Sequence, residues 1–422
     1  MDFRIPAQLD GFLSELDDFI VSAIEPLQRE HEQYFDHRRE WARTDWAAGG
    51  TPAPAWEALL DQARDLADAA GFYRYALPPD LGGRGASNLE MAVVREHLAQ
   101  RGLGLHNDLQ NESSIVANLP FAHILRDFAT PEQKADLLEG MIIGTRHISF
   151  ALTEPDHGSD ATWMDTRAHR DGDSWVITGE KRWNTGVHRA THDVVFARTD
   201  GKDGDAEGIT AFIVPMQAPG MTIVEYDWTF NMPTDHARVR VDRVRAPDSA
   251  ILGGLGGGLR IAQHFVHENR IRQAASRLGA AQHCIDLSVQ RARKRITFGQ
   301  PLANRQAIQW PLVELQTEAE MVRGLVRKAA WSLDETEDPV SVGDLVSMAN
   351  YRANRLVCEA ADRAMQIYGG EGYSRNQPFE HIYRHHRRYR ITEGAEEIQM
   401  RRIAGTLLGF TGAGPRPTTR AR

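Results

Sequence analysis

Residues 345–370, LVSMANYRANRLVCEAADRAMQIYGG, hold the pattern that decides the fold. Small or apolar side chains recur every three or four residues along this stretch, at Leu345, Ala349, Ala353, Leu356, Ala360, Ala364 and Ile367. That spacing predicts a helix of about six turns with one buried face. Small residues on the face permit close packing of helices, and Gly369 and Gly370 then end the helix. The C-terminal part of the chain is therefore predicted to be a helical bundle.

The same periodicity divides the rest of the chain. Residues 1–146 read as helical, and one helix start is clear. There Thr130 supplies a capping hydroxyl, Pro131 stands in the first turn and Gln133 is the capping-box partner. Residues 147–250 read instead as short strands separated by turns, with a hairpin signal at Asp171-Gly172. Helical spacing returns over 251–410, and the polar, basic residues 411–422 are predicted to be a flexible tail. We expect an α+β multidomain protein: an N-terminal helical domain, a middle antiparallel β-sheet or barrel, and a C-terminal four-helix bundle.

Composition limits the class of protein. With 422 residues, 41% hydrophobic and 25% charged, the chain is long enough for several packed modules. The formal charge of −9 argues against a protein that coats nucleic acid. The acidic, amphipathic start does not resemble a signal peptide, and no apolar run is long enough to cross a bilayer. Cys284 and Cys358 are far apart and lack metal-ligand spacing, so no metal site is expected and a cytoplasmic location is predicted.

Three separated segments carry candidate chemistry. RITEGAEEIQ, residues 390–399, places Glu393 beside Gly394, and this carboxylate is the candidate catalytic base. TEPDHGSD, residues 153–160, and KRITFGQ, residues 294–300, supply small hydroxyls and an arginine that suit a phosphorylated redox cofactor. Residue chemistry alone predicts a cofactor-binding protein with helical, β and helical modules.

The order of these modules and motifs resembles the acyl-CoA dehydrogenase family over about residues 55–408. The resemblance implies an FAD-dependent α,β-dehydrogenation of an acyl-CoA thioester, with electrons passed to an electron-transfer flavoprotein. It also implies a homo-oligomer, a tetramer or a dimer, in which QIYGGEGY, residues 366–373, contacts the FAD of a neighbouring subunit. No membrane partner is expected, and a nucleic-acid partner is not favoured.

The resemblance assigns cofactor contacts residue by residue. It implies that Leu152, Thr153 and Ser159 contact the flavin edge, and that Trp183 forms a flat wall with Thr185 beside it. The residue between Trp183 and Thr185 is usually apolar in the family, whereas here it is Asn184. The remaining implied FAD contacts are Arg295, Thr297, Phe298, Gln306, Gln366, Gly369, Gly370 and Glu397. Each motif also has a purely structural interpretation. Residues 153–160 could be a surface turn, Trp183 a core residue, and Gly369-Gly370 a plain helix C-cap.

The resemblance also implies the reaction. Glu393 removes the α-proton while the β-hydrogen leaves as hydride to the flavin, and the base must be desolvated to do this. Ser159, Arg270 and Gly394 are the implied substrate-binding residues. Some family members carry the base immediately before the arginine, where this chain has Asn269, so Glu268 is only a secondary candidate. The usual threonine after the Glu-Gly pair is replaced by Ala395, which is not assigned a contact.

Other functions stay open on sequence grounds. An acyl-CoA oxidase would use the same scaffold with O2 as the electron acceptor. The basic stretch RHHRRYR, residues 384–390, could contact DNA phosphates. A non-catalytic partner subunit is disfavoured because Arg295 and Glu393 are both retained. Polar residues in the stretch 101–114 hint at an acyl group other than a plain long chain, but they do not identify it.

Overall fold

The structure, a computed structural model, describes residues 4–107 and 114–410, without the side chains of His267 and Glu268. The predicted tail and part of the stretch 101–114 therefore lie outside the described residues. The chain divides into two compact units. The bundle unit consists of Met1–Glu30, Arg84–Leu109 and Asn269–Arg422, and the sheet unit of His31–Gly83 and Gln110–Glu268.

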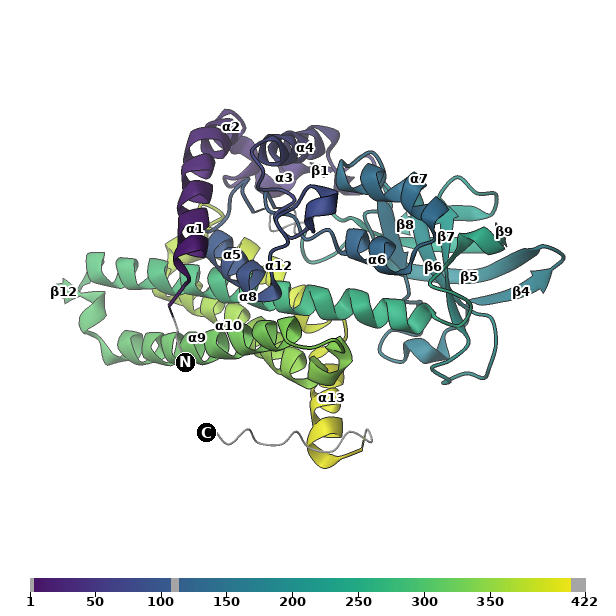
Figure 1. The fold of residues 1–422 in the computed structure, drawn as a ribbon. Helices are drawn as coiled ribbons and strands as arrows, with labels where there is room; N and C mark the ends of the chain where they lie inside the picture. The colour runs from purple at the N-terminus through teal and green to yellow at the C-terminus, as the bar shows by residue number, and fades with distance from the viewer. Residues whose placement is uncertain (1–3, 108–113, 411–422) are drawn as a thin grey trace. The chain divides into compact units, whose positions relative to one another are not determined.

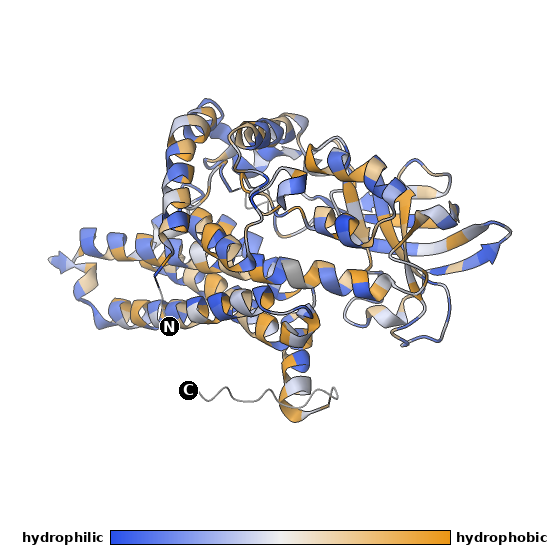
Figure 2. Cartoon of the chain, in the orientation of Figure 1, coloured by the Kyte–Doolittle hydropathy of each residue, from blue (hydrophilic) through white to orange (hydrophobic). Residues whose placement is uncertain are grey.

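Helices build the bundle unit (Figure 1). They are α1 (Ala7–Phe19), α2 (Glu25–Glu30), α5 (Asn88–Gln100), the second part of α8 (Gly258–Lys294), α9 (Gln306–Asp334), α10 (Gly343–Tyr368), α11 (Gly370–Tyr373), α12 (Phe379–Arg387) and α13 (Glu396–Leu408). A small hairpin of β11 (Ile296–Thr297) and β12 (Gln300–Pro301) joins α8 to α9. Figure 2 shows hydrophilic and hydrophobic residues along each of these helices, as expected when one face is buried.

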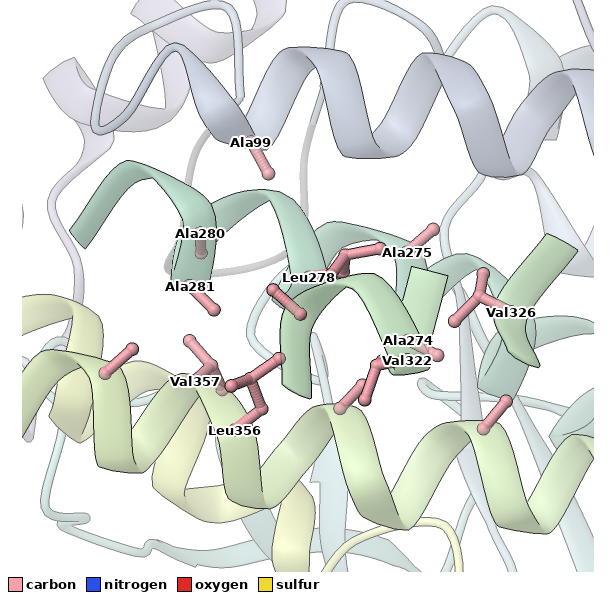
Figure 3. Close-up of a cluster of buried hydrophobic side chains, with 14 of the residues drawn as sticks. Ala99, Ala274, Ala275, Leu278, Ala280, Ala281, Val322, Val326, Leu356 and Val357 are labelled. Atoms are coloured by element: carbon pink, nitrogen blue, oxygen red, sulfur yellow. The ribbon is translucent and has the colours of Figure 1, made fainter. Parts of the chain in front are cut away.

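The core of the bundle unit lies where α8, α9 and α10 meet (Figure 3). All seven residues of the α10 stripe are buried, with exposures from 0 to 6%. Alanines on α8, such as Ala274 and Ala281, give short side chains that let the neighbouring helices approach. Gly369 ends α10 in a conformation with φ +67° that favours glycine. The predicted long helix and its end are therefore confirmed.

The sheet unit combines short helices with a large sheet. Its helices are α3 (Arg39–Arg43), α4 (Pro54–Ala69), α6 (Pro120–Phe128), α7 (Pro131–Ile142) and the beginning of α8. The capping box at the start of α7 is confirmed. The Gln133 backbone N–H donates to Thr130 Oγ1, and the Thr130 backbone N–H donates to Gln133 Oε1.

The sheet lies in the predicted β region. Its strands are β3 (Ile148–Ala151), β4 (Arg167–Asp171), β5 (Ser174–Thr185), β6 (His192–Arg198), β7 (Ile209–Pro215), β8 (Met221–Tyr226), β9 (His236–Pro247) and β10 (Ile251–Leu252). The strand order is β10-β7-β6-β4-β5-β9-β8, and β3 pairs with β6. A separate pair, β1 (Thr44–Asp45) and β2 (Thr51–Pro52), precedes α4.

Most strand pairs are antiparallel, and β4 and β5 form the hairpin predicted at Asp171-Gly172. Two pairings differ from a purely antiparallel sheet, because β3 and β4 each run parallel to β6 where they meet it. The predicted fold class, helical regions flanking a β-rich middle, is confirmed. Among the described residues, no helix is both long and apolar enough to cross a membrane.

Candidate active site

Glu393 lies in the short connection between α12 and α13. Its backbone is left-handed, with φ +56°, and Gly394 follows with φ +86°. A Cβ atom on Gly394 would lie 2.6 Å from the Arg270 Nη2 atom, so glycine is required for both its conformation and this close approach. A non-glycine residue in this conformation is strained, and such strain persists only where the surroundings hold it.

Helix α8 supplies the groups that hold Glu393. Arg270 donates from Nε and Nη2 to the Glu393 backbone carbonyl oxygen, at 3.1 and 2.5 Å. Gln273, one turn further along the helix, donates from Nε2 to the Glu393 carboxylate Oε1 at 2.6 Å. Residues three apart on a helix lie on the same side, so Arg270 and Gln273 hold the backbone and the side chain of Glu393 together.

A second set of contacts fixes these groups in turn. Gln399 Nε2 donates to the Gly394 carbonyl oxygen at 2.9 Å, and Asn350 Nδ2 on α10 donates to the Arg270 carbonyl oxygen at 2.9 Å. Arg270 is 6% exposed, and this burial lowers its pKa to about 10 although Glu393 opposes the shift. Arg270 therefore stays charged at neutral pH. The site presents one carboxylate held at a defined position.

Glu396, three residues later, is held differently. Arg355 and Arg390 each form two hydrogen bonds to its carboxylate, at 2.8 to 3.1 Å. The hydrogen bonds from Arg390 and then Arg355 lower the pKa of Glu396 to about 2, against the effect of burial. A carboxylate held so firmly in its ionised form is a poor proton acceptor. Glu397, an expected FAD contact, is exposed.

The predicted cofactor residues of the bundle unit lie on its surface. Arg295, Phe298 and Gln306 are exposed and Thr297 is half-buried, all at or next to the β11–β12 hairpin. Phe298 is 96% exposed and has φ +48°. An exposed aromatic ring beside an arginine suits a large ligand that carries phosphates and an aromatic base.

Gln366, Gly369 and Gly370 are also exposed, at the end of α10. A Cβ atom on either glycine would meet nothing within 4 Å, so the backbone here is open to a ligand or another chain. The chemistry of both surface segments therefore fits FAD.

The predicted cofactor residues of the sheet unit lie near the end of β5 and in the segment that follows β3. The Arg182 amide N–H donates to the Thr153 carbonyl oxygen at 3.0 Å, which joins the segment after β3, including Leu152, to the strand that carries Trp183. Trp183 is 45% exposed, and Thr185 and Ser159 are exposed. The structure thus brings Leu152, Thr153 and Trp183 to one region of this unit.

A buried ion pair supports this region. Lys181 Nζ donates to Glu154 Oε1 at 2.8 Å and to the Leu152 carbonyl oxygen at 3.1 Å. The Glu154 carboxylate also accepts hydrogen bonds from the amide groups of Asp165 and Thr166. Burial works against the charge of Glu154, but Lys181 and these donors lower its pKa overall. These buried contacts therefore hold the loop after β3 in place.

The basic stretch 384–390 is buried or half-buried and not an exposed strip. None of its residues is exposed, and His385, His386 and Tyr389 are at most 5% exposed. Burial lowers the pKa of both histidines well below the usual value. Arg384 pairs with Glu380, and Arg390 pairs with Glu396. The basic residues that suggested DNA contact are therefore explained by burial and by these ion pairs.

Sequence reasoning missed Gln273 and the role of Arg270 in holding the Glu393 backbone. The available signal was a glutamine three residues after Arg270 on a predicted helix. The alternative base, Glu268, has a side chain outside the described residues. Among the described residues, no group of three or more His, Cys, Asp or Glu could hold a metal ion.

The fold and the site together define a class of protein with helical, β and helical parts, in which Arg270 and Gln273 hold Glu393. The N-terminal, middle and C-terminal domain models of acyl-CoA dehydrogenases match residues 14–145, 149–244 and 256–408. A probable acyl-CoA dehydrogenase of Mycobacterium tuberculosis, FadE2, is 30% identical over 409 residues, 96% of each chain. The bovine mitochondrial short-chain specific acyl-CoA dehydrogenase is 35% identical over 80% of each chain.

Solved structures agree with these relatives. A putative acyl-CoA dehydrogenase from Mycobacterium abscessus matches with a TM-score of 0.83 and 28% identity, over 97% of this chain and all of that one. The chain therefore belongs to the acyl-CoA dehydrogenase family, which is a family of flavoproteins. It is an oxidoreductase that dehydrogenates acyl-CoA thioesters.

Proposed function

We propose that Glu393 is the catalytic base, which removes the α-proton of a bound acyl-CoA thioester. The observation that carries this proposal is the way Glu393 is held. Its strained backbone is fixed by Arg270, and its carboxylate is oriented by the neutral Gln273. Glu396, by contrast, is held in its ionised form by paired hydrogen bonds from two arginines, which makes it a poor proton acceptor.

We further propose FAD as the cofactor, which supplies a hydride acceptor for the β-hydrogen when bound. Arg295 would pair with its pyrophosphate, and Thr297, Phe298 and Gln306 would contact the same part. Gln366, Gly369, Gly370 and Glu397 are the further proposed contacts from the bundle unit. Leu152, Thr153, Ser159, Trp183 and Thr185 would hold the flavin, with the Trp183 indole excluding water from one side.

Substrate contacts are proposed for Ser159, Arg270 and Gly394. Gly394 allows the backbone to approach the thioester, where a side chain would collide with Arg270. Arg270 adds a buried positive charge near the position where negative charge develops on the enolate. The acyl group itself is left to experiment.

A homo-oligomer is the proposed assembly. Helix α9 exposes large apolar residues at helical spacing, with Trp310 63%, Val313 59% and Met321 66% exposed. Phe298 at the neighbouring hairpin is more exposed still. Such a face is typical of a surface that another copy covers, in a tetramer or a dimer.

We propose an electron-transfer flavoprotein as the electron acceptor. A chain in a solved structure that reports the electron transferring flavoprotein of Acidaminococcus fermentans is similar to this chain, with a TM-score of 0.77 and 26% identity over 96% of this chain; the likeness is compatible with the proposal and does not itself identify a partner. An oxidase would instead reduce O2 directly. Reoxidation of the reduced flavin by O2, measured by stopped-flow absorbance, separates the two: slow reoxidation supports the dehydrogenase.

The experiment for the whole proposal follows the flavin spectrum. Anaerobic mixing with a panel of acyl-CoAs that differ in length, branching and ring content should bleach the flavin for the correct class. The Glu393→Gln variant should bind FAD and acyl-CoA without bleaching. Normal bleaching in that variant would overturn the assignment of the base.

A further inference from the structure

Asn184 and Asp193 form a buried polar pair inside the sheet unit. Asn184 lies near the end of β5 and Asp193 near the beginning of β6, and both are 0% exposed. Asn184 Nδ2 donates to Asp193 Oδ2 at 2.6 Å. The reaction proposed above uses neither residue.

The pair lies directly behind two proposed flavin contacts. Asn184 separates Trp183 from Thr185, both of which are exposed while Asn184 points inward. The pairing of β5 with β9 shifts register between Arg182 and Asn184, and Trp183 has φ +68° at that point. A bulge of this kind re-aims side chains, and the buried side chain of Asn184 lies at it.

One oxygen atom of each residue in this pair lacks a hydrogen-bond donor in the described part of the chain. Asn184 Oδ1 and Asp193 Oδ1 are both buried and have no donor among the described residues. The Ser149 hydroxyl is also close enough to stabilise Asp193, but it has one hydrogen, which in this structure donates to the Thr185 carbonyl oxygen at 3.0 Å. A buried charged carboxylate needs more hydrogen bonds than this, whereas two buried oxygens can share one added proton.

We propose that Asp193 carries a proton on Oδ1 and donates it to Asn184 Oδ1, closing a two-bond acid–amide ring that positions Trp183 and Thr185. In this ring the amide donates to Oδ2 and the acid donates back, so both orphaned oxygens gain a partner. Asn184 and Asp193 are thus positioning residues for the flavin wall. The part of this inference that concerns the flavin rests on the proposed function, whereas the proton on Asp193 does not.

The groups around Asp193 are consistent with an acid that titrates near neutrality. Burial raises its pKa to about 7, although the Asn184 amide, the Lys181 ammonium, Ser149 and the Val194 backbone favour the charged form. Lys181 is itself engaged by Glu154 at 2.8 Å, so its charge acts only in part on Asp193. Strand β7 contributes the buried Val214 opposite Asp193. Because the neutral form predominates below the pKa, the ring should open as the pH rises above about 7.

Infrared difference spectroscopy on the full chain tests the proton. Wild-type protein at about pH 6, one unit below the pKa, should show a protonated carboxyl band that Asp193→Asn removes and that fades by about pH 8. The Ser149→Ala variant is the matched control and should keep the band. Absence of any band at pH 6 that Asp193→Asn abolishes would overturn the proposal.

FAD affinity, measured by calorimetry, tests the positioning role. Asp193→Leu and Asn184→Leu each remove one half of the ring, and each should weaken FAD binding by about tenfold, the cost of a lost buried hydrogen bond. Asp193→Asn keeps a neutral donor and acceptor, so it should rescue most of the affinity lost in Asp193→Leu. Equal losses in Asp193→Asn and Asp193→Leu would contradict the ring. If wild-type protein itself fails to bind FAD, the proposed function fails while the infrared result still stands.

Discussion

Two glutamates three residues apart, Glu393 and Glu396, meet different surroundings in the same segment. Glu396 is enclosed by Arg355 and Arg390, which hold it ionised. At Glu393 the arginine binds the backbone carbonyl, and the carboxylate is met by the neutral amide of Gln273. Two carboxylates in one motif can thus meet different donors, which supports the proposal that Glu393 rather than Glu396 is the base.

Exchanging the carboxylate of Glu393 for an amide should have the largest effect. Glu393→Gln keeps the shape but cannot accept a proton, so turnover should fall by about 10³ to 10⁴-fold. Stopped-flow flavin bleaching measures the loss, and the FAD content of the purified variant checks that the cofactor site is intact. If Glu396→Gln lost as much turnover as Glu393→Gln, the contrast between the two carboxylates would be wrong.

Filling the space at Gly394 should have the next largest effect. Gly394→Ala places a methyl group against Arg270 and forces an unfavourable φ, so turnover should fall by about 10²-fold through displacement of Glu393. Gly409, with φ +74° and open space where a Cβ atom would lie, offers a matched control. Comparable losses of turnover in Gly394→Ala and Gly409→Ala would show strain alone, without a role for Arg270.

Removing the amide that orients Glu393 should have a smaller effect. Gln273→Leu leaves the base present but loosely placed, so turnover should fall about tenfold, the cost of one lost hydrogen bond to a charged group. Because this bond favours the ionised base, the acidic limb of the pH profile should move to higher pH. An unchanged profile with reduced turnover would indicate a packing role for Gln273 only.

Neutralising Glu396 should affect stability more than turnover. The pKa of Glu396 is lowered from 4.5 to about 2 in the folded protein, so its stabilising effect is present above about pH 4.5 and lost as the pH falls toward 2. Glu396→Gln should therefore lower the free energy of unfolding by about 1 to 2 kcal/mol at pH 7, and by less at pH 3. Denaturant titrations at the two pH values measure this difference. Equal losses at both pH values would contradict the ion-pair account.

Local patterns in the sequence predicted much of the fold. The α10 stripe, the α7 capping box and the β4–β5 hairpin depend on residues close together in the chain, so their signals are legible. Strands β8 and β10 carry no comparable local signal. Strand β8 pairs only with β9 and has no buried residue, so it lacks the alternation that reveals a strand, and β10 has only two residues.

The site was predictable only in part. Glu393 and the cofactor motifs could be predicted because the family resemblance marks them in the sequence, and their roles stay predictions. Gln273 was missed because its partner is 120 positions away, and no local pattern connects the two. The pairing of Asn184 with Asp193 was missed for a related reason, since burial of both side chains appears only once the strands are assembled.

Deuterium exchange at the α-carbon tests the central claim most directly, because it records proton removal without hydride transfer. The anaerobic protein is incubated in D2O with the acyl-CoA of the panel that bleaches the wild-type flavin, and the label is measured by mass spectrometry. We predict that wild type and Glu396→Gln exchange the α-proton and that Glu393→Gln does not. Exchange by Glu393→Gln at the wild-type rate would show that another group is the base.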